Sequence, residues 1–391
     1  HLGGDGFLPT DQGFDLNIGG NASGSPSSYF PPYRKPALPD GAPGEYLTDR
    51  LTAEAERFIE TNRDRPFFLY LAHYAVHIPL QAKRALVERY QRRHPGRTQT
   101  NYLYAAMVES VDDSVGRIVR KLDQLGLTER TVVFFTSDNG GLSVKEGPHT
   151  PSTSNAPLRG GKGYLYEGGI REPLLVRWPG KVRRGTVCRV PVCSVDFYPT
   201  ILGMAGVMPP ANRALDGVSL VSLLTQSGPL SPRALYWHYP HYSNQGGKPG
   251  GAIRDGAFKL IEFYEDHHLE LYDLEDDLGE TTNLAARMPH QAEEMRRQLA
   301  AWRRSVDAQM PTPNPDYRLA ISPARMVAQS ADGTILLHAR DVTVHGATVR
   351  YEPDPHKNTV GFWTRREDWV SWDFEVAHPG RFAVEIFVLN R

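Results

Sequence analysis

The sequence predicts an α/β fold, in which a central sheet carries helices on both of its faces. Residues 66–72 and 131–135 are apolar runs rich in Phe, Leu and Val that end in polar or glycine-rich segments, as buried strands do. Between them, residues 101–125 carry apolar side chains at helical spacing. The order strand, helix, strand is typical of a sheet with helices packed on it, and such crossovers are nearly always right-handed.

Other elements on both sides of this unit follow from the same patterns. From Glu45 onward, apolar residues recur at helical spacing and predict an amphipathic helix that leads into the first strand. Residues 173–178 predict a further short strand, and Asp196 is placed to cap a helix that begins with Phe197-Tyr198-Pro199. Residues 1–43 are rich in Gly, Pro, Ser and Asn, which favours an irregular surface loop.

After about residue 230 the pattern changes to short alternating segments. Residues 234–237, 258–264 and 269–274 predict strands, and residues 289–306 predict a helix that closes this part. Strands of period two followed by a helix indicate a small antiparallel α+β subdomain. We therefore place a catalytic α/β domain at residues 1–228 and this subdomain at residues 229–309.

The remaining residues predict a separate module. Four prolines in residues 310–325 indicate a semi-rigid linker. Residues 326–391 contain short alternating segments at 333–338, 342–345, 349–351 and 369–376, which predict an incomplete β-sandwich. Such a module could bind carbohydrate or have a purely structural role.

The composition excludes some classes of function. The 391 residues are 40% hydrophobic and carry 44 basic and 45 acidic side chains, so the chain can bury a large core and is not expected to bind nucleic acid. No run reaches the roughly 18 apolar residues of a membrane span. The two cysteines, Cys188 and Cys193, could pair locally or remain as inert, half-buried thiols.

Three short motifs carry side chains suited to chemistry. Asp138-Asn139 follows the strand at 131–135, and its hard oxygen donors suit Ca²⁺ or Mg²⁺, although Asp-Asn-Gly is also common in turns. His77 follows the strand at 66–72, where an imidazole could transfer a proton. Lys162 lies in a glycine-dense loop, and there it could hold an anion or simply be solvated. A structural histidine satisfied by the backbone describes His73 better than His77.

The order and wording of these motifs resemble the sulfatase family, of the arylsulfatase and N-acetylgalactosamine-6-sulfatase kind, within the alkaline-phosphatase-like superfamily, across residues 1–315. The resemblance implies a sulfuric ester hydrolase that uses one Ca²⁺ ion and a formylglycine nucleophile made from a cysteine. It implies that His77 and Lys162 contact the sulfate group and that Asp138 and Asn139 supply part of the calcium site. His1-Leu2-Gly3 matches a family motif in which the histidine lies beside the formylglycine.

The resemblance also leaves parts of the expected site unfilled. Neither Cys188 nor Cys193 lies in the family's formylglycine motif, and the paired aspartates of the calcium site are not found in the sequence. We therefore expect a fragment whose nucleophile and remaining ligands lie upstream of His1, and which is inactive as it stands. An internal ion-pair brace of Glu167, Arg171 and Glu172 is expected to hold the lysine loop.

The expected substrate is a sulfated carbohydrate or an aryl sulfate. His238, His241 and Arg254 are candidates for its binding rim. By family, the protein is expected to be exported, to the periplasm or the exterior of the cell. Two alternatives stay open: a phosphonate monoester or phosphodiester hydrolase of the same superfamily, and a non-catalytic glycan-binding protein with a degenerate hydrolase core.

Overall fold

A computed structural model describes residue 4 and residues 6–35, 37–93, 96, 98–312, 326–353 and 358–386. The chain divides into two compact units, His1–Pro311 and Thr312–Arg391, which are described separately below. His1, the first candidate site residue, lies outside the described residues. No helix among the described residues is long and apolar enough to cross a membrane.

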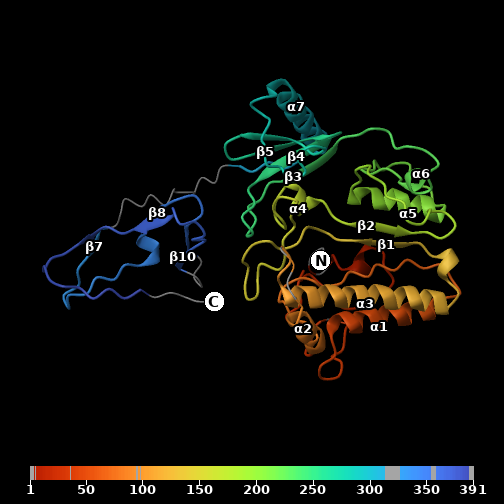
Figure 1. The fold of residues 1–391 in the computed structure, drawn as a ribbon, viewed down its shortest axis with the longest axis horizontal. Helices are drawn as coiled ribbons and strands as arrows, with labels where there is room; N and C mark the ends of the chain where they lie inside the picture. The colour runs from red at the N-terminus through yellow and green to blue at the C-terminus, as the bar shows by residue number, and fades with distance from the viewer. Residues whose placement is uncertain are drawn as a thin grey trace. The chain divides into compact units, whose positions relative to one another are not determined.

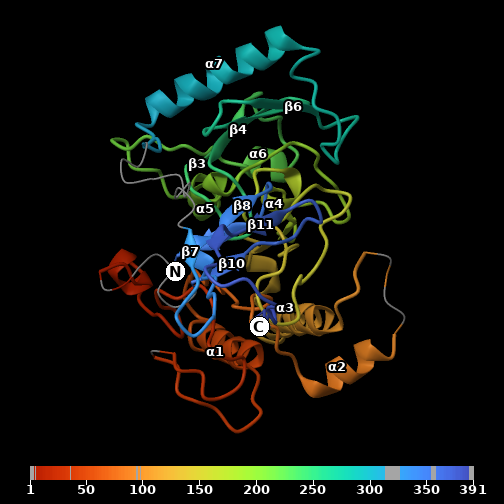
Figure 2. The ribbon, with the colours of Figure 1, turned by 90° about the vertical axis from the view of Figure 1, so that its left-hand side faces the viewer.

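The first unit has the predicted α/β architecture, with helices on both sides of a short sheet. The sheet consists of β1 (Val133–Thr136) and β2 (Leu174–Arg177), which pair antiparallel. On one side lie α1 (Leu47–Thr61), α2 (Arg84–Gln91) and α3 (Tyr102–Gln124), and on the other lie α5 (Phe197–Ala205) and α6 (Val221–Leu224) (Figure 1, Figure 2). The apolar stripes that predict α1 and α3 explain this layer, because Ile59 and Leu122 pack together with Val133 of β1.

The prediction of a strand at residues 66–72 is wrong in one respect. This segment forms no ladder with another strand in the described part of the chain. Its side chains do alternate as predicted: Phe67 and Leu69 pack against the α1 and α3 layer, whereas Phe68 and Tyr70 are 55% and 73% exposed. Period two fixes which side chains share a face but does not name a partner strand. The expected right-handed crossover into β1 is therefore absent from the described residues.

The predicted helix after Asp196 is present, but Asp196 does not cap it through its side chain. The carboxylate is fully buried, accepts the backbone N–H groups of Cys193 and Val218, and pairs with Arg233. These contacts lower the pKa of Asp196 against the opposing effect of burial. Asp196 therefore joins three segments rather than ending one helix.

Residues 235–305 form a four-stranded antiparallel sheet covered by one helix. The strands are β3 (Leu235–Tyr239), β4 (Gly250–Asp255), β5 (Phe258–Phe263) and β6 (Leu269–Asp273), in that order, and the helix is α7 (Pro289–Ser305). One face of the sheet buries Ile253, Leu260 and Leu271 against α7. The opposite face packs Ala252, Ile261 and Tyr272 against Leu165 and Tyr166, which belong to the loop that carries Lys162.

Strand β4 lies outside the segments that the alternation pattern predicts as strands. It begins with two glycines, which are poor strand formers and hide the pattern. Lack of space explains why the second of these residues, Gly251, is a glycine. A Cβ there would lie 2.4 Å from the Tyr264 hydroxyl oxygen. The glycine thus permits close packing inside the sheet.

In the described part of the second unit, six short strands form three two-stranded pairs. They are β7 (Val327–Ala328) with β12 (Phe374–Glu375), β8 (Thr343–His345) with β11 (Trp369–Ser371), and β9 (Arg350–Glu352) with β10 (Thr359–Gly361). The segment predicted at 333–338 is not a strand. The β-sandwich and its carbohydrate binding stay predictions, and most of the predicted linker, residues 313–325, lies outside the described residues.

Candidate active site

His77 and Lys162 come from distant segments and meet at hydrogen-bond distance. Lys162 Nζ lies 2.8 Å from His77 Nε2, and His77 Nδ1 lies 2.9 Å from the carbonyl oxygen of Ile78. Because a carbonyl can only accept, Nδ1 carries the proton and Nε2 turns its lone pair to the lysine ammonium. Both side chains are half-buried, and the contact places a cation, Lys162, beside a proton acceptor, His77.

The segment that carries His77 is fixed by a buried tyrosine. The Tyr29 hydroxyl donates to the carbonyl oxygens of Tyr74 (2.7 Å) and His77 (2.9 Å). Tyr29 is fully buried, and this burial raises the pKa of its phenol. The N-terminal loop, which looked irregular in the sequence, therefore supplies a rigid support for the histidine.

The Asp138-Asn139 turn and the loop that carries Lys162 are bonded to each other through their backbones. Lys162 N–H donates to the Gly141 carbonyl (3.2 Å), and Gly140 N–H donates to the Gly169 carbonyl (3.1 Å). The glycines permit this approach, since a Cβ at Gly140 would lie 1.8 Å from the Gly168 oxygen. The two motifs therefore form one structural unit.

Asn155 reinforces this unit, and sequence reasoning did not identify it. Its Oδ1 accepts the Gly141 N–H (3.0 Å), and its Nδ2 donates to the carbonyls of Gly141 (2.9 Å) and Gly160 (3.0 Å). An amide side chain is suited to this task because it both donates and accepts. In the sequence, Asn155 is simply one polar residue in a Ser- and Thr-rich loop.

Asp138 and Asn139 lie where a cation could bind, beside a third oxygen-bearing residue. Asn139 Nδ2 donates to Asp138 Oδ1 (2.9 Å), which leaves the side-chain oxygen of Asn139, Oδ1, available. Glu172 is close enough to Asp138 that burial and, second, the Asp138 charge raise the pKa of the Glu172 carboxyl to about 7. Its Oε1 is buried without a hydrogen-bond partner in the described part of the chain.

These donors fit a hard divalent cation in chemistry but do not make up a full set. Ca²⁺ takes about six to eight oxygen ligands. Among the described residues no group of three or more His, Cys, Asp or Glu side chains is arranged to hold a metal. Asp138, Asn139 and the unpartnered Glu172 oxygen are thus compatible with part of a calcium site.

The ion-pair brace predicted for the lysine loop is present around Glu167 but has different members. The buried Glu167 carboxylate lies 3.0 Å from Lys259 Nζ, 3.4 Å from Arg171 Nη1 and 3.7 Å from Arg254 Nη1. Glu172 has none of the ion pairs of this cluster among the described residues, so its predicted membership is wrong. The sequence does hold a hint of the role of Lys259, because a charged residue between Phe258 and Leu260 in a predicted buried strand needs a partner.

Comparison with known proteins decides the family. The profile of the sulfatase family matches residues 5–207, just over half of the chain, and that of the N-sulphoglucosamine sulphohydrolase C-terminal region matches residues 161–305. The chain belongs to the sulfatase family. A sulfatase of Formosa agariphila is 36% identical over 68% of this chain and 52% of its own length. Human N-acetylgalactosamine-6-sulfatase is 35% identical over 59% of this chain and 45% of its own.

Solved structures agree with this assignment. The crystal structure of Ps i-CgsB in complex with k-i-k-neocarrahexaose matches with a TM-score of 0.60 and 30% identity, covering 70% of this chain and 58% of that one. The chain spans about half the length of the two curated relatives described above. The fold of this member of the sulfatase family is therefore that of the alkaline-phosphatase-like superfamily.

The three residues predicted to form the substrate-binding rim are held in different ways. Both ring nitrogens of His238 are engaged, with the Tyr264 hydroxyl (2.7 Å) and the Gln309 carbonyl (2.8 Å). The His241 side chain is exposed, and the Arg254 side chain is 20% exposed with its guanidinium near Glu167. Their contact with substrate stays a prediction.

Residues 243–245, next to Lys162, are held by hydrogen bonds to Glu146. The Glu146 carboxylate accepts from the side-chain amides of Asn244 and Gln245, each at 2.6 Å. A Cβ at Gly163 would lie 2.1 Å from Ser243 Oγ, so residues 243–245 pack directly on the lysine loop. Sequence reasoning did not select Glu146, which has no motif of its own.

The two cysteines of the chain are both free. Cys188 is exposed and Cys193 is half-buried, so the local disulfide considered from the sequence is absent. Cys193 fits the alternative of a half-buried thiol, whereas Cys188 is more exposed than that alternative expected.

Proposed function

We propose that this protein is a calcium-dependent sulfatase that hydrolyses sulfate esters of a sulfated carbohydrate. The observation that carries the proposal is the 2.8 Å contact between Lys162 Nζ and His77 Nε2, on a loop that is hydrogen-bonded to the Asp138-Asn139 turn. Sulfate ester cleavage needs a cation at the sulfuryl oxygens and a proton for the alcohol that leaves. Lys162 and His77 meet both needs.

In the proposed reaction Lys162 binds the sulfate group and lies closest to the ester oxygen. The Lys162 ammonium can donate a proton to the departing alkoxide, and His77 Nε2, whose lone pair faces it, is placed to hold the shared proton between them. The carbonyl of Ile78 keeps the imidazole in the tautomer that this needs.

The cation and the nucleophile complete the proposal. Asp138 and Asn139, with Glu172 as a further candidate, would hold part of the Ca²⁺ site, and the ion would offset the negative charge of the sulfate. The family's formylglycine would supply the nucleophile. Because Cys188 and Cys193 lack its sequence motif and the relatives are about twice as long as the matched part, we propose that it lies outside these residues.

The substrate class rests on the relatives. One is named as an N-acetylgalactosamine-6-sulfatase, and one solved neighbour holds k-i-k-neocarrahexaose. His241 and Arg254 are the proposed rim contacts to the sugar. In keeping with the family, we propose that the enzyme is exported to the periplasm or beyond the cell.

The test is turnover by the full-length natural protein, purified with Ca²⁺, on an aryl sulfate, a phosphonate monoester and a panel of sulfated oligosaccharides. We expect release of sulfate from the aryl ester and from at least one saccharide, and loss of turnover after chelation of calcium. Faster hydrolysis of the phosphonate would support the other branch of the superfamily. Binding of a sulfated glycan without any release would support the non-catalytic alternative and contradict ours.

A further inference from the structure

The lysine loop is clamped onto the C-terminal sheet by a buried ionic cluster. Lys259 of β5 has a fully buried side chain whose Nζ lies 3.0 Å from Glu167 Oε1 and 2.9 Å from Glu280 Oε1. The other oxygen of Glu280 accepts the backbone N–H of Glu167 at 2.7 Å. One ammonium thus joins two carboxylates from distant segments, and one of these segments is the loop that carries Lys162.

The cluster has too little solvent around it to be a surface ion pair. The side chains of Glu167 and Glu280 are 3% and 0% exposed. Burial raises the pKa of Glu280, and Lys259 opposes this rise. Without the ammonium, Glu280 would lose its cation, and Glu167 would keep only the longer contacts of its other oxygen with Arg171 and Arg254. We expect the loop to move, or one carboxylate to take up a proton, in response.

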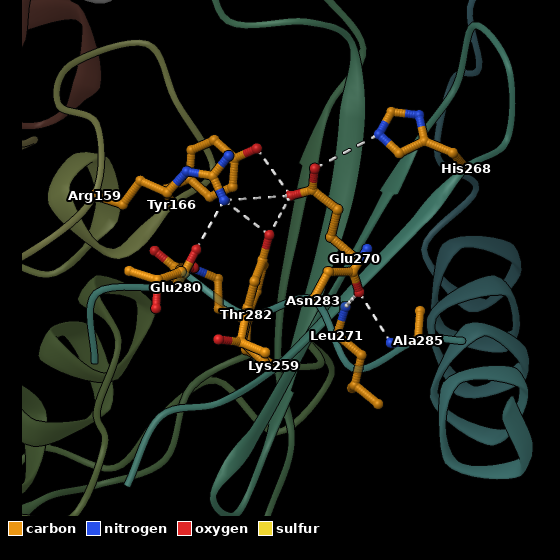
Figure 3. A network of polar contacts seen from close by, with 12 residues as sticks. Arg159, Tyr166, Lys259, His268, Glu270, Leu271, Glu280, Thr282, Asn283 and Ala285 are labelled. Atoms are coloured by element: carbon orange, nitrogen blue, oxygen red, sulfur yellow. Dashed lines mark hydrogen bonds and ion pairs between the residues drawn. The ribbon is translucent and has the colours of Figure 1, made fainter. Parts of the chain in front are cut away.

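A second, partly exposed set of contacts holds the same loop on the same face of the sheet (Figure 3). The Arg159 guanidinium lies 3.9 Å from the centroid of the Tyr166 ring and donates to the Tyr272 hydroxyl (2.8 Å) and the Glu280 carbonyl (2.9 Å). The Tyr166 hydroxyl donates to Glu270 at 2.8 Å. Both ends of the loop, residues 159 and 166–167, are therefore tied to the sheet, with Lys162 between them.

The cluster is connected to the catalytic groups through few bonds. Glu167 begins the short helix α4 (Glu167–Ile170), whose Gly169 carbonyl accepts the Gly140 N–H next to Asp138-Asn139. Gly168 N–H donates to the Arg159 carbonyl at 2.8 Å, and a Cβ at Gly168 would lie only 2.4 Å from that oxygen. A shift at Glu167 would therefore disturb both the contact beside Asp138-Asn139 and the Arg159 end of the loop that carries Lys162.

We propose that Lys259 is a positioning residue, whose buried ammonium, shared by Glu167 and Glu280, fixes the lysine loop against the Asp138-Asn139 turn. Lys259 acts through the loop and does not touch the sulfate group. The proposal rests on the proposed sulfatase function for its effect on turnover, but its effect on Lys162 is measurable without turnover.

The kinetic test compares Lys259→Met, Lys259→Arg and the control Lys181→Met in the full-length enzyme. Lys181 is exposed and lies outside this cluster. With an aryl sulfate, at a temperature where each variant is folded by circular dichroism, Lys259→Met is expected to lower kcat about 100-fold, because small misplacement of catalytic groups has effects of this size. Lys259→Arg should recover part of the loss, since it keeps the charge, and Lys181→Met should match the wild type.

A double-mutant cycle separates positioning from a general loss of structure. If Lys259 acts by placing Lys162, the Lys259→Met loss should largely disappear in the Lys162→Ala background, where there is no ammonium left to place. Equal losses in both backgrounds would contradict the proposal, as would normal kcat in Lys259→Met. If Lys259→Met does not fold, Glu280→Gln replaces it in the same cycle, because the amide can still accept the Glu167 N–H.

A second measurement keeps the proposal testable if the enzyme has no sulfatase activity. The rate at which an amine-reactive reagent modifies Lys162, followed by mass spectrometry, should rise about tenfold in folded Lys259→Met, because an unpositioned lysine loses its His77 contact. An inactive wild type with this rise would contradict the proposed function and support the positioning role. Unchanged labelling of Lys162 would contradict the positioning role, whatever the activity.

Discussion

Lys162 and Glu167 are five residues apart on one loop, but their charges are held in opposite ways. The Lys162 ammonium is half-buried and meets one neutral ring, that of His77. The Glu167 carboxylate is 3% exposed and has Lys259, Arg171 and Arg254 around it. In the first arrangement the Lys162 charge is not neutralised by its partner, so it can attract an anion. In the second, the Glu167 charge is balanced by cations within the protein. In our proposal, one end of the loop therefore serves chemistry and the other serves anchorage.

The largest expected effect tests the chemical end. Lys162→Ala in the full-length enzyme should lower kcat for an aryl sulfate by about 10³-fold, since it removes both a charge at the sulfate and the proton donor. Its unfolding free energy should hardly change, because the lysine has no buried ion pair among the described residues. Steady-state kinetics and urea unfolding on the same sample check both halves. Wild-type rates would remove Lys162 from the site.

The next effect tests the anchored end. Glu167→Gln should lower the unfolding free energy by about 3 kcal/mol, because it leaves the buried Lys259 with one charged partner fewer. The matched control is Glu293→Gln on α7, whose pair with Arg296 is exposed and contributes little to stability. Urea unfolding of both variants gives the comparison. If the two variants lose equal stability, the buried cluster is no stronger than a surface pair.

The sequence could predict those elements whose signal lies within a short stretch. The apolar stripes of α1, α3 and α7 gave helices within a few residues of Leu47–Thr61, Tyr102–Gln124 and Pro289–Ser305. The three motifs with His77, Lys162 and the Asp138-Asn139 turn could be selected because each combines a reactive side chain with a strand end or a glycine-rich loop.

The parts that the sequence could not predict depend on partners far along the chain. Lys259 and Glu167 are separated by 92 residues, and nothing near either one names the other. Asn155 is informative only when the carbonyls of Gly141 and Gly160 lie on either side of it. The missing ladder at residues 66–72 has the same origin, since alternation shows a strand's faces but not its neighbour.

A smaller effect sharpens the contrast on the segment that carries His77, where His73 and His77 lie four residues apart. His77 faces Lys162, whereas His73 Nε2 bonds the Ser114 hydroxyl (2.9 Å) and its Nδ1 is buried without a partner among the described residues. The expected structural role of His73 thus involves a side chain rather than the backbone. Burial lowers the pKa of the His73 imidazole to about 4, against a weaker opposing effect of Asp49.

The lowered pKa of His73 predicts that the folded protein loses stability as the pH falls. Between pH 6.5 and about 4 the unfolded chain binds a proton at His73 that the folded protein does not, so stability falls as pH is lowered through this window and levels off below it. The total is at most about 3 kcal/mol. His73→Leu should flatten the slope of unfolding free energy against pH, whereas the exposed His290→Leu should leave it unchanged. Equal slopes in both variants would show that His73 does not titrate in this way.

The smallest effect tests whether the two ends of the lysine loop are rigidly joined. A Cβ at Gly168 would lie 2.4 Å from the Arg159 oxygen and 2.7 Å from the Gly160 oxygen, and both are backbone atoms that cannot rotate away. Gly168→Ala should therefore cost about 2 kcal/mol of stability through a backbone shift. Because Lys162 lies between the displaced residues, kcat should fall in the same variant. Gly228→Ala, where a Cβ would meet nothing within 4 Å, should change neither quantity. Loss of stability without loss of turnover in Gly168→Ala would mean that the anchored end can move while Lys162 stays in place, and the two ends of the loop would then be independent.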